Sequence, residues 1–571
     1  MRPRPGGRRP STHGFGSDGA IAVLVALGAA AALLSRVPHR RAAIVVGCCL
    51  ATLALIAGVA VLLSRRRGLV APERSNPFHR TDRRAPDGWA TRTDLVPLLL
   101  RDPPGDRIVL GSTQGRLVAA EPRQSVLVVG PSQSGKTRGL AVPAILEWSG
   151  PVLATSVKAD LVQATIDERR RLGAVAVFDP SQAIGSVATA GERTGWSPLG
   201  AAGTWQGARR IAAAMCDVAE GDGGMEDAGF WYASAEKLLA PLLFAAAVSG
   251  SSMSDVVRWI DDEEIGEVLL ALELAGVAEA TRAARTSFRR EDRQRSSVFA
   301  TAETVVAGFA DPQLADASRR ACIDPASLVS QGSAAPGPRW RPSTLYCCAP
   351  AREQQRLRPV FTALVREVID AAFAGAARSG GPLSPGLLIV LDEAANVAPL
   401  AELDAILATA AGHGIQLMTV WQDFAQIEAR YGRRWSTIVN NHRAKVVCPG
   451  ISDPLTLDHV EALIGEHERN EVSTTFDPDG RRSRTEVTAL RRLAPAGSLR
   501  RLSAGSAALL YGGLPPARVR LRPAVVEERS ARRLDRHAMR RRPTKAPPAS
   551  TTALTAIRSS PRPEGPPGGK P

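Results

Sequence analysis

Residues 125–137 read Ser125-Val126-Leu127-Val128-Val129-Gly130-Pro131-Ser132-Gln133-Ser134-Gly135-Lys136-Thr137. The apolar, β-branched run predicts a buried strand, and Gly, four residues and Gly-Lys-Thr form the pattern of a phosphate-binding loop, or P-loop. In such a loop, backbone N–H groups converge on phosphate oxygens at a helix N-terminus. The sequence therefore predicts a phosphate site made by Gly130, Pro131, Ser132, Gln133, Ser134, Gly135, Lys136 and Thr137.

The last two residues of this motif carry the chemistry. We expect Lys136 to reach the outer phosphates of a nucleotide and the Thr137 hydroxyl to ligate Mg²⁺. The chain has 72 Lys and Arg, of which only six are Lys. Where Arg is the usual cation, a Lys at this position indicates that a compact point charge is needed. ATP and Mg²⁺ are therefore the expected cofactors.

Two later strands end in residues that complete this chemistry. The run Leu387-Leu388-Ile389-Val390-Leu391 leads into Asp392 and Glu393, as in a Walker B strand. We expect Asp392 to hold Mg²⁺ and Glu393 to orient and deprotonate the attacking water. The strand 416–421 ends at Gln422, which we expect to sense the γ-phosphate or to position water at the carboxyl edge of the sheet. The expected catalytic residues are Lys136, Glu393 and Gln422, and the expected metal ligands are Thr137 and Asp392.

Composition indicates a large, basic protein with reduced thiols. A chain of 571 residues is too long for a single core, so more than one domain is expected. The net charge of +16 favours a polyanionic partner, either nucleic acid or an anionic membrane face, without choosing between them. The seven Cys have no metal-site spacing, which indicates structural thiols.

Two apolar segments near the N-terminus predict a membrane anchor. Residues 19–34 are uncharged and span about 24 Å as a helix, while residues 42–63 span about 33 Å and are followed by Arg65-Arg66-Arg67. Read alone, the first segment also fits a cleaved signal peptide. Because ATP is cytosolic, we expect a multi-pass protein of the cell membrane with both ends in the cytoplasm.

The rest of the chain predicts an α/β fold with a helical insertion. Apolar strands alternating with helices indicate a parallel sheet covered on both faces. The segments expected are an anchor (1–67), a connector (68–106), the first part of the nucleotide-binding domain (107–200), an all-α domain (201–340), the second part of the nucleotide-binding domain (341–525) and a disordered basic tail (526–571). The polar segment 465–488 fits a hairpin or a flexible loop, and two late strands, 507–511 and 517–521, are expected to close the sheet.

Two basic regions have open interpretations. The helical stretch 277–310 carries arginines that either contact DNA phosphates or form a solvated helix face, namely Arg282, Arg285, Arg289, Arg290, Arg293 and Arg295. Residues 529–571 carry eleven Lys and Arg against two acids. This tail is either a DNA- or partner-binding arm or a solvated end.

These motifs together resemble the TraG/TraD-type coupling ATPases of type IV secretion, the conjugative DNA-transfer family. The resemblance covers roughly residues 89–525. Besides the apolar segments and the P-loop, it rests on Ser156-Val157-Lys158-Ala159-Asp160-Leu161, Trp196-Ser197-Pro198-Leu199, Phe230-Trp231, Leu391-Asp392-Glu393-Ala394-Ala395-Asn396, Trp421-Gln422-Asp423, Tyr431-Gly432 and Asn440-Asn441. The resemblance implies a RecA-like P-loop NTPase sheet with an inserted all-α domain, preceded by two transmembrane helices.

The same resemblance implies a function and partners. Members assemble as homohexamers at the membrane and feed relaxase-bound, single-stranded DNA or protein substrates into the type IV secretion channel. The chain departs from the family pattern before the Gln422 strand, where only His413 stands in place of a basic residue that acts on a neighbour's nucleotide. Arg430, Arg434 and Arg443 are the alternative candidates for this arginine finger.

Two other functions remain open from the sequence. One is an FtsK-like translocase of double-stranded DNA, which the helical insertion and the two apolar segments disfavour. The other is a membrane docking receptor that binds nucleotide without hydrolysing it, which the intact Lys136, Asp392 and Glu393 disfavour.

Overall fold

The computed structural model describes residues 88–182, 184–219, 228–320, 323–330, 343–476 and 482–523. These residues belong to the compact unit Arg84–Pro571. The apolar segments 19–34 and 42–63 and the basic tail lie outside them. Within these ranges, no helix combines the length and apolar character needed to cross a membrane.

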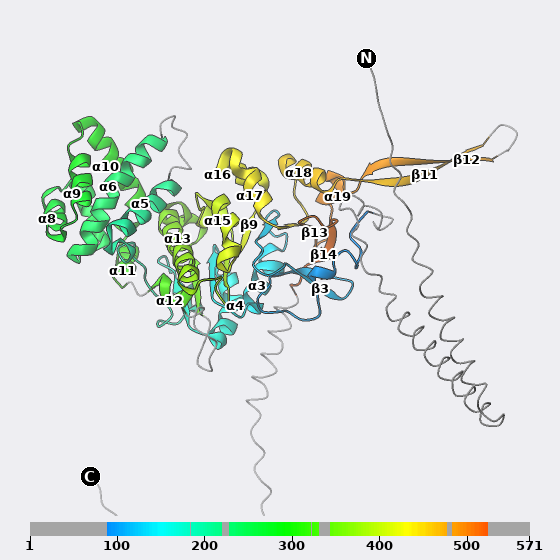
Figure 1. Cartoon of the computed structure of the whole chain (residues 1–571), viewed down its shortest axis with the longest axis horizontal. Coiled ribbons are helices and arrows are strands. Elements are labelled where there is room, and N and C mark those ends of the chain that lie inside the picture. The colour runs from blue at the N-terminus through cyan, green and yellow to red at the C-terminus, as the bar shows by residue number, and fades with distance from the viewer. Residues whose placement is uncertain are drawn as a thin grey trace, which may run out of the picture. The chain divides into compact units, whose positions relative to one another are not determined.

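A twelve-stranded sheet runs through the described chain (Figure 1). The strand before the P-loop, β4, lies in the middle of its strand order. In chain order its strands are β1 (Leu99–Leu100), β2 (Val109–Thr113), β3 (Arg116–Ala119), β4 (Val126–Val129), β5 (Val152–Ser156), β6 (Val175–Phe178), β7 (Thr344–Cys348), β8 (Leu387–Leu391), β9 (Ile415–Trp421), β10 (Ala444–Val447), β13 (Ser506–Tyr511) and β14 (Ala517–Arg520). Their spatial order is β1-β3-β2-β14-β13-β10-β4-β9-β8-β5-β7-β6.

The sheet has a parallel part, from β10 to β6 in this order, and an antiparallel part, from β13 to β1. All strands from β10 to β6 in this order pair in parallel. Strands β13, β14, β2, β3 and β1 pair antiparallel with their neighbours. The predicted α/β fold is confirmed, and the two late strands do join the sheet.

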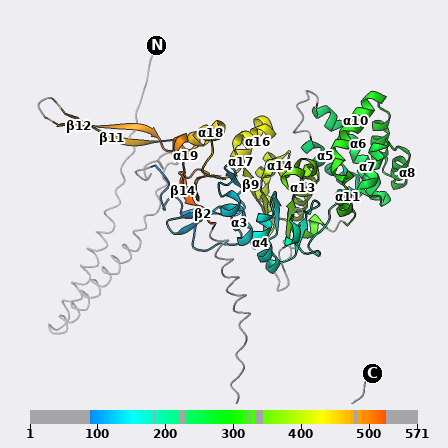
Figure 2. The same ribbon diagram turned by 180° about the vertical axis from the view of Figure 1, so that it is seen from behind.

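Helices cover both faces of the parallel part, as predicted (Figure 2). Alternate residues of β4 point to opposite cores, since Val126 and Val128 belong to one buried cluster and Leu127 and Val129 to the other. The first face packs against α3 (Val142–Glu147) and α4 (Ala159–Leu172). The second packs against α13 (Gln354–Ser379), α15 (Leu403–Thr409), α16 (Phe424–Tyr431), α17 (Trp435–Asn441) and α18 (Pro454–Ile464).

Several strands of the sheet differ from the sequence prediction. Strand β2, near the start of the expected nucleotide-binding domain (107–200), pairs antiparallel with β3 and does not open the parallel series. Neither β3 nor β10 was predicted. Each has four residues and includes a charged one, Arg116 or Lys445, so the apolar run is too short to identify a strand.

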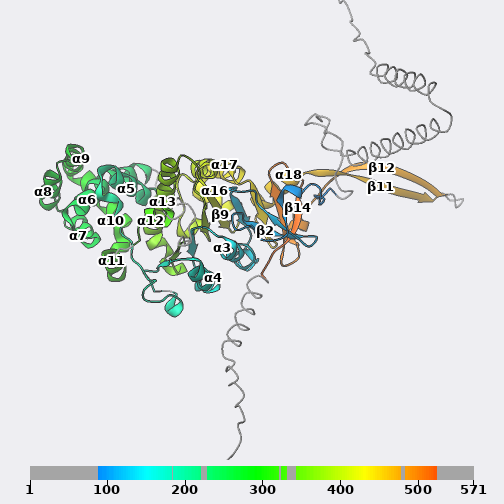
Figure 3. The same ribbon diagram turned by 60° about the horizontal axis from the view of Figure 1, so that its bottom comes forward.

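Between β6 and β7 the described residues form helices and connecting turns without a strand (Figure 3). They are α5 (Trp205–Ala219), α6 (Ala228–Ser249), α7 (Met253–Asp261), α8 (Gly266–Ala275), α9 (Ala278–Phe288), α10 (Asp292–Val306), α11 (Pro312–Arg319) and α12 (Pro325–Ser330). The buried helix α6 packs against α5, α8, α9 and α10. The stretch 277–310, taken as one segment in the sequence, is divided at Arg289–Glu291 into α9 and α10.

The polar segment after α18 is a hairpin, so the flexible-loop alternative is wrong for its described part. Strands β11 (Glu466–Phe476) and β12 (Arg482–Arg492) pair antiparallel over their whole length and form a sheet of their own. This ribbon projects beside α18 and α19 (Ala496–Arg500) in Figures 1 and 3.

Candidate active site

The P-loop leaves the sheet at the carboxyl end of β4, between β10 and β9. A Cβ atom on Gly130 would lie 2.6 Å from the Cβ of Cys448 and 2.7 Å from Ser134 Oγ, so only glycine fits there. Gly135 adopts a φ of +91°, which L side chains avoid. The two glycines of the motif are therefore required by a close approach and by backbone conformation.

The loop presents free backbone donors. Among the described residues, the N–H groups of Ser132, Gln133 and Gly135 donate no hydrogen bond. Gln133 has a φ of +65°, so right- and left-handed residues follow one another and turn successive N–H groups toward one side. Such a nest favours an anion, and the donor set therefore fits the phosphates of a nucleotide.

Lys136 is folded into this loop. Its Nζ donates hydrogen bonds to the carbonyl oxygens of Gly130 and, at 2.8 Å, of Pro131. Burial lowers the pKa of Lys136, and the nearby carboxylates of Glu393 and Asp392 oppose that shift. The ammonium group therefore lies where it could contact phosphate oxygens, and without a nucleotide it is hydrogen-bonded to carbonyl groups of its own loop.

Asp392 lies at the end of β8, directly beside the first helical residue after the P-loop. Thr137 Oγ1 is 3.2 Å from Asp392 Oδ2, and Thr155 Oγ1 donates to the Asp392 main-chain oxygen at 3.2 Å. Burial raises the pKa of Asp392 to about 6, and the Glu393 carboxylate adds to the shift. Hydroxyl and carboxylate oxygens at this spacing are the ligand types that Mg²⁺ prefers.

Glu393 and Gln422 meet across the neighbouring strands β8 and β9. Gln422 Nε2 donates to Glu393 Oε2 at 3.3 Å. Glu393 has a φ of +55°, a left-handed conformation that costs a non-glycine residue on the order of 1 kcal/mol. The backbone turns sharply here into the short helix α14 (Ala394–Val397), which leaves the carboxylate at the sheet edge.

The structure therefore brings together the residues that the sequence singled out, from three adjacent strands. Thr155 and Cys448 belong to the same site and were missed. Thr155 lies one residue before the end of β5, a position with no motif to mark it. Cys448 directly follows β10, a strand that the sequence did not predict. Neither residue carries a sequence signal of its own.

Each arginine-finger candidate is engaged within its own chain. Arg430 donates to the Asp217 main-chain oxygen at 3.2 Å, Arg434 pairs with Asp404 at 3.2 Å, and Arg443 pairs with Glu121 at 3.0 Å. His413 Nδ1 lies 3.0 Å from the Thr409 main-chain oxygen. The finger remains unassigned among these residues.

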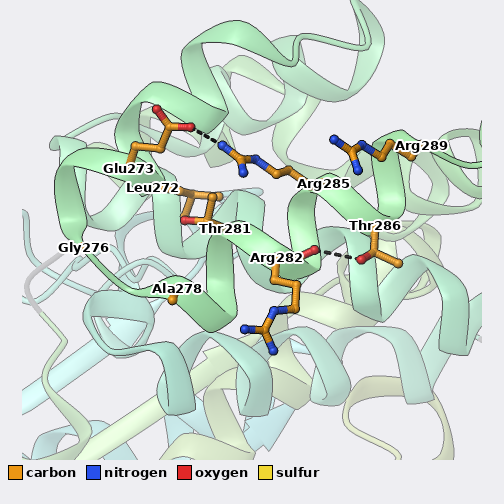
Figure 4. A pocket seen from close by; sticks show the side chains of 9 residues that line it. All are labelled: Leu272, Glu273, Gly276, Ala278, Thr281, Arg282, Arg285, Thr286 and Arg289. Atoms are coloured by element: carbon orange, nitrogen blue, oxygen red, sulfur yellow. Dashed lines mark hydrogen bonds and ion pairs between the residues drawn. The ribbon is translucent and has the colours of Figure 1, made fainter.

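Arginines of α9 and Arg289, directly after it, line a hollow at the surface of the helical region (Figure 4). Arg285 pairs with Glu273 at 2.6 Å, while Arg282 and Arg289 flank it along the helix. Residues 201–330 contain 20 Asp and Glu against 12 Lys and Arg, a net charge of −8 within a chain of +16. This balance favours the solvated-face interpretation over a DNA contact on α9.

Asp392→Asn is expected to stabilise the protein without ligands at pH 8. The native pKa of about 6 exceeds the ordinary 3.8, so the native state binds the proton more tightly and loses stability as pH rises through this window. A neutral amide removes that cost, about 1 to 3 kcal/mol. Thermal unfolding of nucleotide-free, metal-free protein should show a higher Tm for the variant at pH 8 and little difference at pH 4. A lower Tm of the variant at pH 8 would contradict this origin of the shift.

Comparison with known proteins places this geometry in context. The family described as type IV secretory system conjugative DNA transfer matches residues 97–521. Two Escherichia coli proteins named conjugal transfer protein TraG are each 25% identical over 368 residues, covering 60% of this chain and 55% of theirs. The chain thus spans about half the length of these curated relatives.

Solved structures of the bacterial conjugative coupling protein TrwB share the fold. The unbound monoclinic form of TrwBdeltaN70 aligns with a TM-score of 0.56 and 19% identity, over 76% of this chain and 91% of that one. TrwB in complex with ADP and Mg²⁺ aligns with a TM-score of 0.55 and 18% identity, over 76% of this chain and 92% of that one. The predicted α/β architecture with a large parallel sheet is therefore the fold of these proteins.

Proposed function

Because the chain belongs to the type IV secretory system conjugative DNA transfer family, we propose that it is a coupling ATPase of conjugation. In this role it recruits relaxase-bound DNA or a protein substrate and drives its transfer into a secretion channel by hydrolysing ATP. The observation that carries the proposal is the convergence of Lys136, Thr137, Asp392, Glu393 and Gln422 at one sheet edge.

Each of these side chains has a role in the proposed hydrolysis. Bound ATP and Mg²⁺ supply the transferable phosphoryl group and the divalent charge that neutralises it. Lys136 would exchange its loop carbonyls for phosphate oxygens, and the hydroxyl of Thr137 and the carboxylate of Asp392 would hold the metal. The Glu393 carboxylate accepts a proton from water, and the Gln422 amide fixes that carboxylate or the water beside it.

The TrwB complex with ADP and Mg²⁺ supports these cofactors, and the unpaired amides of the P-loop supply the donors they need. A receptor that only docks substrates would have no use for a strained Glu393 aimed at Gln422. This contact favours hydrolysis over the non-hydrolysing alternative. We further propose a homohexamer, in which a basic residue of a neighbouring copy completes each site.

The substrate can be identified by isolating the protein from cells during transfer, together with what is bound to it. Immunoprecipitation of the full-length protein from transferring cells should recover single-stranded plasmid DNA together with a relaxase, read by strand-specific sequencing and mass spectrometry. Recovery of double-stranded chromosomal DNA from dividing cells would point to the FtsK-like alternative instead. A Lys136→Ala variant expressed at the same level provides the control for transfer that depends on ATP.

Membrane anchoring through residues 19–34 and 42–63 is part of the same proposal. Two apolar segments would place both ends of the chain on the same side of the membrane. Because ATP is cytosolic, that side is the cytoplasm, and only residues 35–41 face outward. Val37→Cys, placed in a chain lacking Cys48 and Cys49, should react with an impermeant maleimide in intact cells, whereas Arg501→Cys should not. Labelling of the second site but not the first would overturn this topology.

A further inference from the structure

A hollow lined by three arginines lies at the outer, antiparallel part of the sheet, between the turn after α19 and the strand β14. Its charged residues are Arg501, Arg518 and Arg520, and its polar ones include Ser498, Ser503 and Ser506. None of the residues that line it is acidic. We refer to it below as the three-arginine pocket.

Strand alternation places two of these arginines. Ala517 and Val519 are buried in the core of one sheet face, so Arg518 and Arg520 stand exposed on the other. The guanidinium of Arg518 lies over the Trp89 ring, 4.4 Å from its centroid. Arg501 Nε donates to the Gly497 main-chain oxygen at 3.0 Å. These contacts orient the cations without neutralising them.

The pocket contains no counter-charges for its arginines. Two other arginines of this part of the chain are paired, Arg443 with Glu121 at 3.0 Å and Arg522 with Glu147 at 2.8 Å. Among the described residues, no carboxylate lies within ion-pair distance of Arg501, Arg518 or Arg520. Three unpaired guanidiniums beside hydroxyl groups form a site that suits phosphate oxygens.

The sheet register places the pocket on the same edge as the P-loop. Arg520 pairs with Ser506, which begins β13, and β13 runs antiparallel to β10, the neighbour of β4. Three strand spacings, about 14 Å, therefore separate β14 from β4. A backbone bond joins the two sites, because Gly450 N donates to the Arg500 main-chain oxygen at 3.0 Å. A Cβ atom on Gly450 would lie 3.2 Å from Pro131 Cγ of the P-loop.

We propose that the three-arginine pocket binds backbone phosphates of a single DNA strand beside the nucleotide site. Arg518 and Arg520 are two residues apart on one strand face, so about 7 Å separates their Cα atoms, a spacing that suits successive phosphates. Trp89 is buried, with Arg518 over one face of its ring, so it is not available for base stacking. The pocket therefore reads charge and not base sequence. This inference rests on the proposed function, since it assumes that DNA is the cargo.

The test compares two pairs of arginines in the full-length protein. Binding of a fluorescent oligothymidylate is titrated with salt for wild type, Arg518→Ala/Arg520→Ala, and the control Arg282→Ala/Arg289→Ala in the α9 hollow (Figure 4). Both variants remove two exposed guanidiniums and leave buried residues untouched. Loss of two phosphate contacts should reduce the slope of log affinity against log salt by about 1.4 for the β14 pair, and by nothing for the control.

The outcomes separate the pocket from the wider function. If wild type binds DNA and the β14 variant shows the wild-type slope, or if both variants lose slope equally, the pocket is not the site although the proposed function stands. If the wild-type protein binds no DNA, both the pocket proposal and the proposed role in DNA transfer are wrong. Retention on beads coated with anionic phospholipid that depends on Arg518 and Arg520, with an unchanged DNA slope, would assign the pocket to lipid and overturn the proposal.

Discussion

Replacing Glu393 by Gln is expected to lower kcat for ATP hydrolysis by a factor of about 10² to 10⁴ while nucleotide affinity stays at the wild-type value. The Gln side chain has the same size as Glu and keeps an oxygen that can accept the hydrogen bond from Gln422 Nε2, which is 3.3 Å long to Glu393 Oε2 in the structure. It cannot take a proton from water. Loss is therefore confined to the chemical step, because binding depends on the P-loop and the metal ligands.

Two measurements check this result. Phosphate release gives kcat, and titration with a fluorescent ATP analogue gives the Kd. Glu402→Gln serves as the matched control. Glu402 forms an ion pair of 2.6 Å with Arg366 and is not one of the nucleotide-site residues, so its replacement should leave kcat unaltered. Undiminished hydrolysis by the Glu393 variant would remove this residue from the role of base.

The second large effect is expected from Lys136→Ala, which should weaken ATP binding by a factor of about 30 to 150. Charge-assisted hydrogen bonds contribute on the order of 2 to 3 kcal/mol, and the ammonium is buried in the loop that would surround the phosphates. Lys136→Arg should be nearly as impaired, because a planar guanidinium does not fit between the Gly130 and Pro131 carbonyls.

Titration calorimetry with ATP and Mg²⁺ measures this loss directly. Lys237→Ala removes an exposed lysine of α6 and should bind as wild type does. Comparison with Glu393→Gln is informative, because one variant should lose binding and the other turnover. Equal ATP affinity of the Lys136 variant and wild type would show that the loop does not hold the phosphates.

The distribution of charge bears on where substrates act. Residues 201–330 are acidic, with a net charge of −8, although the whole chain carries +16. Three arginines without an ion-pair partner, Arg501, Arg518 and Arg520, lie together beside β14, on the edge of the sheet that carries the P-loop. If DNA is the cargo, as proposed above, it should therefore be held near the nucleotide-binding sheet and not on the acidic helical region.

Much of this arrangement follows from local sequence pattern. The P-loop, the Asp392-Glu393 pair and Gln422 each stand directly after a buried apolar run, and the ends of parallel strands meet at one edge, so the site was predictable before the fold was seen. The long helices of the insertion were equally clear, because their apolar positions recur with helical spacing over many turns.

Other features depend on contacts between distant parts of the chain. Thr137 and Asp392 are 255 residues apart, and the spatial order of β8, β5 and β4 brings Thr155 beside them. The antiparallel strand β3 and the parallel strand β10 are too short to be recognised alone, and neighbouring strands stabilise them. The three-arginine pocket exists only because β14 pairs with β13 and because Asp and Glu lie elsewhere. Local pattern is set by a few neighbouring residues, whereas pairing and charge balance depend on the whole sheet.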